Sequence, residues 1–121
     1  MKLIPIPVNK ENFYRRVLEV VKAMPPINKL RPKELAVLAE LMRLNDELRH
    51  LDTVHRYMII NSTETRKKIR TKLNMPEASF NNNISILRKY KILTKSNKLN
   101  PFFEDIEYSE GFRLGFLFKE K

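Results

Sequence analysis

The sequence has no cysteine, no tryptophan and only two glycines in 121 residues. Without cysteine the chain has no disulfide, no thiolate nucleophile and no zinc site with cysteine ligands. Gly111 and Gly115 cannot supply a glycine-rich phosphate-binding loop. Long apolar runs are also missing, because none approaches the roughly 20 residues of a membrane-spanning helix. We therefore expect no membrane partner.

Residues with catalytic or metal-binding chemistry are also scarce. His50 and His55 are the only histidines, and their five-residue spacing does not place both rings on one face of a helix. The acidic residues 104–110 are better explained as a solvated turn than as a catalytic pair. We expect no enzyme activity, no metal and no cofactor.

Length and composition indicate one globular domain. The chain is 42% hydrophobic and 31% charged, which is typical of a globular protein, and 121 residues suffice for a single core. A short apolar run at the start is interrupted by Pro5 and Pro7, so it lacks the apolar stretch of a secretion signal. These features predict a protein that stays inside a cell.

Negative charge is almost absent from one block of the chain. The net charge is +10 overall, but residues 66–98 hold ten Lys or Arg and one Glu, whereas residues 1–65 sum to +3 and residues 99–121 to −2. A concentrated basic surface attracts polyanions, and each neutralised phosphate releases counterions. Nucleic acid is the expected partner, and the alternative is a solvated basic face without a partner.

Apolar spacing predicts two amphipathic helices and a strand in the first half. The first helix covers residues 9–24 and the second runs from Pro32, a residue suited to a first helical turn, to about Arg49. Residues 51–61 are rich in strand formers, so we expect a short strand there after a loop.

The second half predicts two short helices joined by a tight turn. Ser62 or Thr63 can cap the first of them, residues 74–76 break it, and a second helix runs from Pro76 to about Tyr90. A strand is expected at 92–94, a turn directly after it at 95–98, and a second strand at 112–118. The expected fold class is mainly α with a small β-wing, a winged helix-turn-helix.

Residues 65–80 and 87–93 resemble the recognition segment of MarR-like winged-helix proteins, and in particular small helix-turn-helix proteins encoded by tailed bacteriophages. The resemblance implies buried positions, which are Leu73, Met75, Phe80, Ile84, Leu87, Ile92 and Leu93. Two positions depart from the family pattern. Pro76 replaces a capping Ser or Thr, and Lys91 replaces a glycine, which costs about 1 kcal/mol in a left-handed conformation.

Helical spacing assigns the predicted contacts with DNA. With the buried positions facing inward, the residues turned outward as candidate base readers are Ser79, Asn81, Asn82 and Ser85. Candidate phosphate contacts are Arg66, Lys67, Lys68, Arg70, Lys72, Arg88, Lys89, Lys95 and Lys98. The alternatives stay open: 81–83 is a polar stretch with Asn83 turned inward to a backbone group, and 95–98 is a solvated turn.

Two functions remain as hypotheses. The first is a double-stranded DNA-binding transcriptional regulator or replication accessory factor in the cytoplasm of a bacterial host, with residues 9–24 and the final strand as candidate homodimer surfaces or core covers. The second is a phage virion assembly protein that contacts other structural proteins. Both use one domain, 1–121, divided into an N-terminal extension and helix (1–28), a helix-turn-helix core (30–98) and a C-terminal strand region (99–121).

Overall fold

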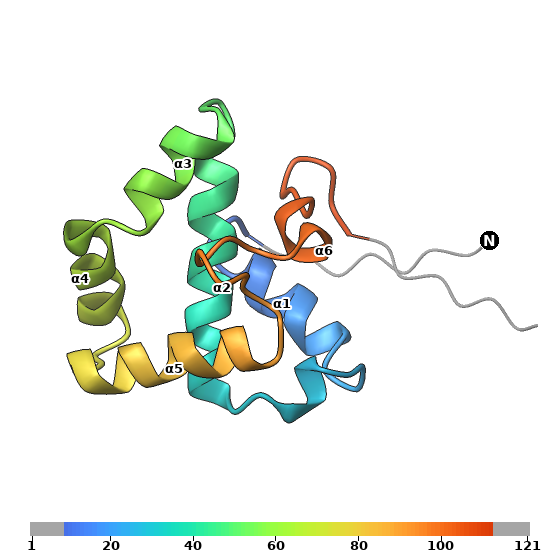
Figure 1. Cartoon of the computed structure of the whole chain (residues 1–121). Helices are drawn as coiled ribbons and strands as arrows, with labels where there is room; N and C mark the ends of the chain where they lie inside the picture. The colour runs from blue at the N-terminus through green and yellow to red at the C-terminus, as the bar shows by residue number, and fades with distance from the viewer. Residues whose placement is uncertain (1–8, 113–121) are drawn as a thin grey trace, which may run out of the picture.

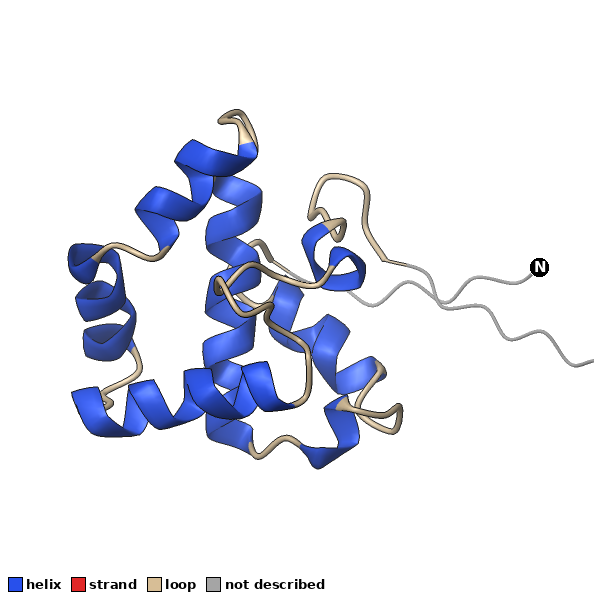
Figure 2. Ribbon diagram, viewed as in Figure 1, coloured by secondary structure: helices blue, strands red, loops and turns tan. Residues whose placement is uncertain are grey.

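The computed structural model describes residues 9–112, which fold mainly into helices (Figures 1 and 2). In chain order the elements are α1 (Phe13–Val20), the 3-10 helix η1 (Ile27–Lys29), α2 (Pro32–Glu47), α3 (Thr53–Ile60), α4 (Thr63–Lys72), α5 (Glu77–Lys89) and α6 (Pro101–Glu104). The central helix is α2, against which α1, α3, α5 and α6 all pack, while α4 contacts α3 and α5.

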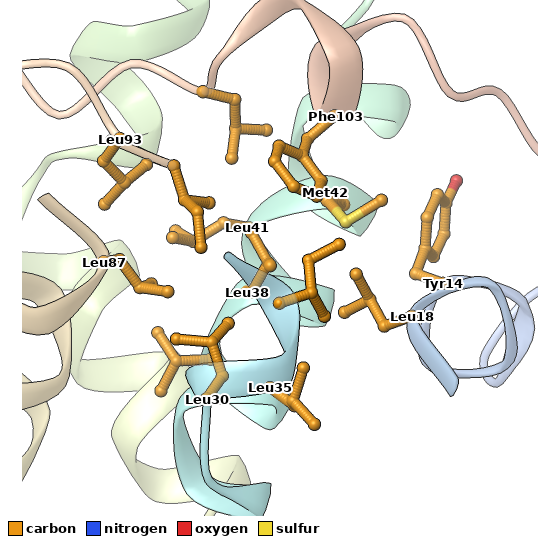
Figure 3. Close-up of a cluster of buried hydrophobic side chains, with 14 of the residues drawn as sticks. Tyr14, Leu18, Leu30, Leu35, Leu38, Leu41, Met42, Leu87, Leu93 and Phe103 are labelled. Atoms are coloured by element: carbon orange, nitrogen blue, oxygen red, sulfur yellow. The ribbon is translucent and has the colours of Figure 1, made fainter. Parts of the chain in front are cut away.

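The hydrophobic core surrounds α2 (Figure 3). Leu38 and Met42 lie one turn apart on α2 and are fully buried, with Leu18 of α1 and Leu87 of α5 also fully buried in the same cluster. Burying a side chain of this size stabilises the fold by about 1.5 to 3 kcal/mol. The core therefore holds α5 against α2 and determines which face of α5 remains open.

The expected β-wing is wrong, because the described residues contain no strand. Leu93 and Leu99 form only an isolated antiparallel bridge, and the Thr94 N–H donates to the Lys98 carbonyl at 2.8 Å. The second half of the hairpin cannot lengthen, because the Asn100 side chain caps α6 and Pro101 begins it. Proline has no N–H for a ladder and suits a first helical turn.

The strand expected within residues 51–61 is also wrong, because this segment forms α3. The Asp52 side chain accepts a hydrogen bond from the His55 N–H at 2.8 Å and caps the helix. Tyr57 and Ile60 then lie on one buried face at helical spacing. Packing against α2 and a side-chain cap outweigh the strand preference of these residue types, which depends strongly on context.

The other boundaries differ less from those expected. The helix predicted over 9–24 is shorter at both ends, since α1 runs from Phe13 to Val20; before it, Asn9 and Asn12 exchange backbone to side-chain hydrogen bonds of 2.9 and 3.0 Å. One face of α1 is buried against the core. This helix therefore covers the core, which was the expected alternative to a homodimer surface. The prediction that α2 begins at Pro32 is confirmed. The strand expected at 112–118 lies outside the described residues after its first position.

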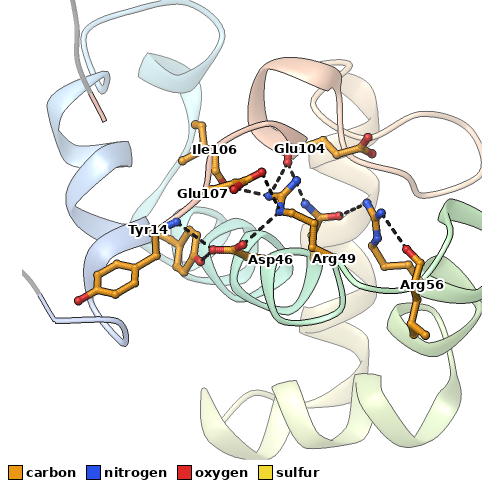
Figure 4. A network of polar contacts seen from close by, with 10 residues as sticks. Tyr14, Asp46, Arg49, Arg56, Glu104, Ile106 and Glu107 are labelled. Carbon is orange, nitrogen blue, oxygen red and sulfur yellow. Dashed lines mark hydrogen bonds and ion pairs between the residues drawn. The ribbon is translucent and has the colours of Figure 1, made fainter. Parts of the chain in front are cut away.

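A polar network holds the segment after α6 against α1 and α2 (Figure 4). The Asp46 carboxylate accepts hydrogen bonds from the Tyr14 hydroxyl, the Arg49 guanidinium and the Tyr108 N–H. Arg49 also donates to the carbonyl of Glu104 at 2.9 Å. These bonds connect three segments that are distant in the sequence, and so they position α6 beside the C-terminal half of α2.

Replacing Asp46 by Asn is expected to lower the free energy of unfolding by about 1 to 2 kcal/mol at neutral pH. Burial raises the pKa of Asp46, but the hydrogen bonds from Tyr108, Tyr14 and Arg49 outweigh it and lower the pKa overall. Such a carboxylate stabilises the fold above its unfolded pKa of about 3.9, and the contribution is lost as the pH falls through the lower folded pKa.

Urea unfolding between about pH 7 and pH 3 measures this contribution. The wild-type protein should lose more stability than Asp46→Asn as the pH falls through the acidic range. Asp105→Asn removes an exposed carboxylate from the same segment and serves as the control. Parallel pH profiles for the wild type and Asp46→Asn would contradict this role of Asp46.

Candidate nucleic-acid interface

Local hydrogen bonds define the turn between α4 and α5. The Ser62 hydroxyl accepts from the Thr65 N–H at 3.2 Å and caps α4, as predicted. At the other end of α4, Asn74 is left-handed with φ of 51°, and the Met75 N–H donates to the Arg70 carbonyl at 2.8 Å. This is the Schellman pattern of helix termination, and it produces the tight turn of a helix-turn-helix.

The rotation of α5 about its axis agrees with the helical spacing of the sequence. Phe80, Ile84 and Leu87 are buried as predicted, and Ile69 of α4 is buried in the same core cluster. Pro76 precedes α5 without a side-chain cap, so the helix begins one residue later than predicted. The face opposite the buried residues is consequently open along most of α5.

The predicted base readers lie on or beside this open face. Asn81, Asn82 and Ser85 are exposed, and Ser79 is half-buried. The Ser85 hydroxyl donates to the Asn81 carbonyl at 3.1 Å and accepts from Arg88 at 3.2 Å. Within residues 9–112 the side-chain amides of Asn81 and Asn82 make no hydrogen bond, which leaves both amides available to a ligand.

Asn83 is turned inward, as one of the alternatives expected. Its side chain is buried and its Nδ2 atom donates to the Met75 sulfur at 3.1 Å, not to a backbone group. Sulfur is a weak acceptor, but the contact joins α5 to the turn before it. Asn83 is thus a structural residue, whereas its two neighbours face outward.

The cations of α4 lie beside those of α5. Lys67 and Lys68 are exposed, whereas Arg66 is half-buried with its guanidinium 5.8 Å from the centre of the Phe80 ring. Burial and the charge of Arg88 lower the pKa of Arg66, although an arginine remains charged at neutral pH. Because the charge of Arg88 acts on Arg66, these two like charges, one from each helix, lie near each other on this surface.

Lys72 is separate from the other predicted phosphate contacts. Its ammonium lies 2.7 Å from a Glu40 carboxylate oxygen, and the other oxygen of Glu40 lies 2.9 Å from Arg43. Arg70, in contrast, is half-buried beside the turn. A phosphate contact by Lys72 would require its ion pair with α2 to break, and this ion pair could not be predicted from local sequence patterns.

The remaining predicted cations lie at the end of α5 or in the turn that follows it. Lys89 is exposed with its ammonium 5.7 Å from the centre of the Tyr90 ring, Lys95 is exposed in the turn after the bridge, and Lys98 is half-buried there. Lys91 has φ of 60°, so it occupies the left-handed position expected for it, and the Ile92 N–H bonds to the Leu87 carbonyl at 3.0 Å. A second Schellman turn therefore leads the chain out of α5.

A shallow hollow lies at the turn between the two helices. It has a volume of about 400 Å³ and is lined by Lys67, Arg70, Thr71, Asn74, Met75 and Pro76. Thr71 and Asn74 were not among the site residues predicted from the sequence. The sequence does indicate a helix end at Asn74, because asparagine tolerates the left-handed conformation that ends a helix.

No known protein family, curated protein or solved structure matches the chain. The resemblance to MarR-like winged-helix proteins therefore remains a prediction from the sequence. Within residues 9–112 no group of three or more His, Asp or Glu side chains is placed to hold a metal ion. No helix in that part of the chain combines the length and apolar character needed to cross a membrane.

Proposed function

We propose that the protein binds double-stranded DNA, with α5 in the major groove and α4 across the phosphate backbone. One observation carries the proposal. Of the predicted phosphate-binding cations, all but Lys72 lack an ion pair within residues 9–112, and they gather on and beside a helix-turn-helix whose outer helix face is open. Uncompensated cations on such a motif favour a polyanion with the geometry of duplex DNA.

The exposed amides of Asn81 and Asn82 support reading of bases, because an Asn side chain can bond N6 and N7 of adenine together. On this basis we propose a role as a transcriptional regulator or replication accessory factor in the bacterial cytoplasm, because such a role uses reading of bases. The alternative of a virion assembly protein would use the same basic surface without a preferred DNA site.

Titration of a labelled duplex of about 20 base pairs tests the proposal. The logarithm of the association constant should fall linearly with the logarithm of salt concentration, with a slope of about −0.9 for each phosphate contact. Five to eight contacts would give a slope of roughly −4.5 to −7. Absence of binding at about 50 mM salt would contradict the proposal.

Replacing Asn82 by Ala separates reading of bases from general binding. The variant should remain as stable as the wild type, since alanine is the better helix former, and it should bind the preferred duplex about 1 to 3 kcal/mol more weakly. Binding to a scrambled duplex should be unchanged. Asn28→Ala removes an exposed amide outside the helix-turn-helix and is the matched control. Equal losses on both duplexes, or none on either, would exclude base reading by Asn82.

A further inference from the structure

The outward face of α3 carries three exposed apolar side chains beside the exposed His55, which pairs with Asp52. Val54 is 64% exposed, Met58 66% and Ile59 42%. Val54 and Met58 are one turn apart, so with Ile59 they form a continuous raised strip, the α3 ridge. A helix with apolar residues on both its buried and its outer face normally covers another surface.

A concave apolar surface lies elsewhere on the molecule. This groove has a volume of about 230 Å³ and is lined by Met24–Ile27, Tyr90–Ile92, Asn100, Phe102 and Phe103. Met24 is 39% exposed and Phe102 47% exposed at its edge. Its volume is below the roughly 300 to 1,000 Å³ of most small-molecule sites, so it is suited to one or two apolar side chains.

The α3 ridge and the groove cannot meet within one molecule. Residues 24–27 precede the N-terminal end of α2, whereas α3 follows its C-terminal end, as Figure 1 shows. The 16 residues of α2 separate the two ends by about 24 Å. The groove residues at 100–103 lie closer to α3, but α3 faces that segment through Tyr57, whose hydroxyl bonds to Leu99 and Glu104, while the ridge on its other face is exposed. The ridge of one copy can therefore fill only the groove of another copy.

The charges beside the two surfaces are complementary. Within residues 51–65, which include the α3 ridge, the exposed carboxylates are Asp52 and Glu64, and the one arginine, Arg56, is turned inward and bonded to Asn45 at 3.0 Å. The segments that line the groove instead carry or adjoin four exposed cations, Lys22, Lys29, Lys89 and Lys91, and one exposed carboxylate, Asp105. Two copies of a chain with a net charge of +10 repel each other in most orientations. When the ridge of one copy faces the groove of another, the local charges instead attract.

We infer that a second copy of this chain docks its α3 ridge into the groove, with Met58 and Val54 as the inserted side chains. The contact joins two different surfaces, so it is heterologous and repeats from copy to copy in a row. The ridge consists of three side chains, whereas a stable complex buries roughly 800 Å² from about 20 to 30 residues per partner, so we expect the association to be weak. The inference does not depend on DNA binding.

Sedimentation velocity without DNA, from roughly 10 to 500 µM protein, tests this contact. The sedimentation coefficient of the wild type should rise with concentration. Met58→Glu on the ridge and Phe102→Glu in the groove should each remain monomeric, because a carboxylate would be buried in either case. Val54→Glu and Met24→Glu are second variants for each surface, and Ser109→Glu, which adds the same charge on neither surface, should associate like the wild type. Circular dichroism confirms that each variant is folded.

Mixing the two monomeric variants gives the decisive result. Phe102→Glu retains an intact ridge and Met58→Glu an intact groove, so an equimolar mixture should form a one-to-one dimer that cannot extend further. Three outcomes would overturn the inference. The first is a wild type that stays monomeric, which would mean that the groove takes another protein or another segment. The second is that the single variants associate like the wild type. The third is a mixture that stays monomeric, which would indicate a symmetric contact through one surface.

Discussion

The Phe80→Ala variant is expected to lose about 3 to 5 kcal/mol of unfolding free energy. Phe80 is 1% exposed and packs in the core near the start of α5, so truncation leaves a cavity that the surrounding helices cannot fill. A loss of this size is a large part of the 5 to 15 kcal/mol that stabilises a typical domain. Much of the variant should be unfolded before its DNA binding is measured.

Urea or thermal unfolding followed by circular dichroism measures this loss. Asn82→Ala is the matched control, because it truncates an exposed residue two positions later on the same helix. A normal unfolding curve for Phe80→Ala would mean that α5 is rotated differently from the structure. It would then remove the physical basis for calling Asn81 and Asn82 outward-facing.

Replacing Arg66, Lys67 and Lys68 together by Ala should weaken binding to all duplexes alike. If all three contact phosphates, the slope of log affinity against log salt becomes shallower by roughly 2.7, because each lost contact removes about 0.9. At about 0.1 M salt we expect an affinity loss on the order of a hundredfold. Preferences among sequences should be retained, since phosphate contacts carry little sequence information.

A control variant with Lys22, Lys29 and Lys33 replaced by Ala removes the same charge from exposed positions outside the helix-turn-helix. The loss of three charges is the same in both triple variants. The salt slope of DNA binding should therefore change more for the Arg66, Lys67 and Lys68 variant than for this control. Because Arg66 also packs on Phe80, the double variant Lys67→Ala, Lys68→Ala tests the exposed cations without disturbing that contact. Equal slopes for both triple variants would contradict a localised interface.

Local patterns predicted the helix-turn-helix and the two helices before it, but not α3 or the reduced wing. The caps and breaks at Ser62 and Asn74 lie within the chain segment that they terminate, so the sequence shows them directly. The structure of α3 depends instead on packing of Tyr57 against α2 and against Glu104, which is 47 residues away. The reduced wing likewise depends on the start of α6 immediately after Leu99.

Helix periodicity predicted which side chains of the candidate site face outward, but not their contacts with other helices. A spacing of about 100° per residue correctly turned Asn81 and Asn82 outward and Phe80 inward. The ion pair of Lys72 with Glu40 was not predictable, because it depends on how α4 sits relative to α2. The inward turn of Asn83 could be listed only as an alternative, since an amide can face either side of a helix until its partner is known.

An NMR titration of the ¹⁵N-labelled protein with duplex DNA tests most directly whether the helix-turn-helix binds DNA. At low salt the amide shifts should change in α4, in the turn at residues 73–76, along the open face of α5 and in the turn at 94–98. The amides of α1 and α3 should change little. Absence of shift changes at low salt, or changes confined to α1 and α3, would contradict the proposed interface.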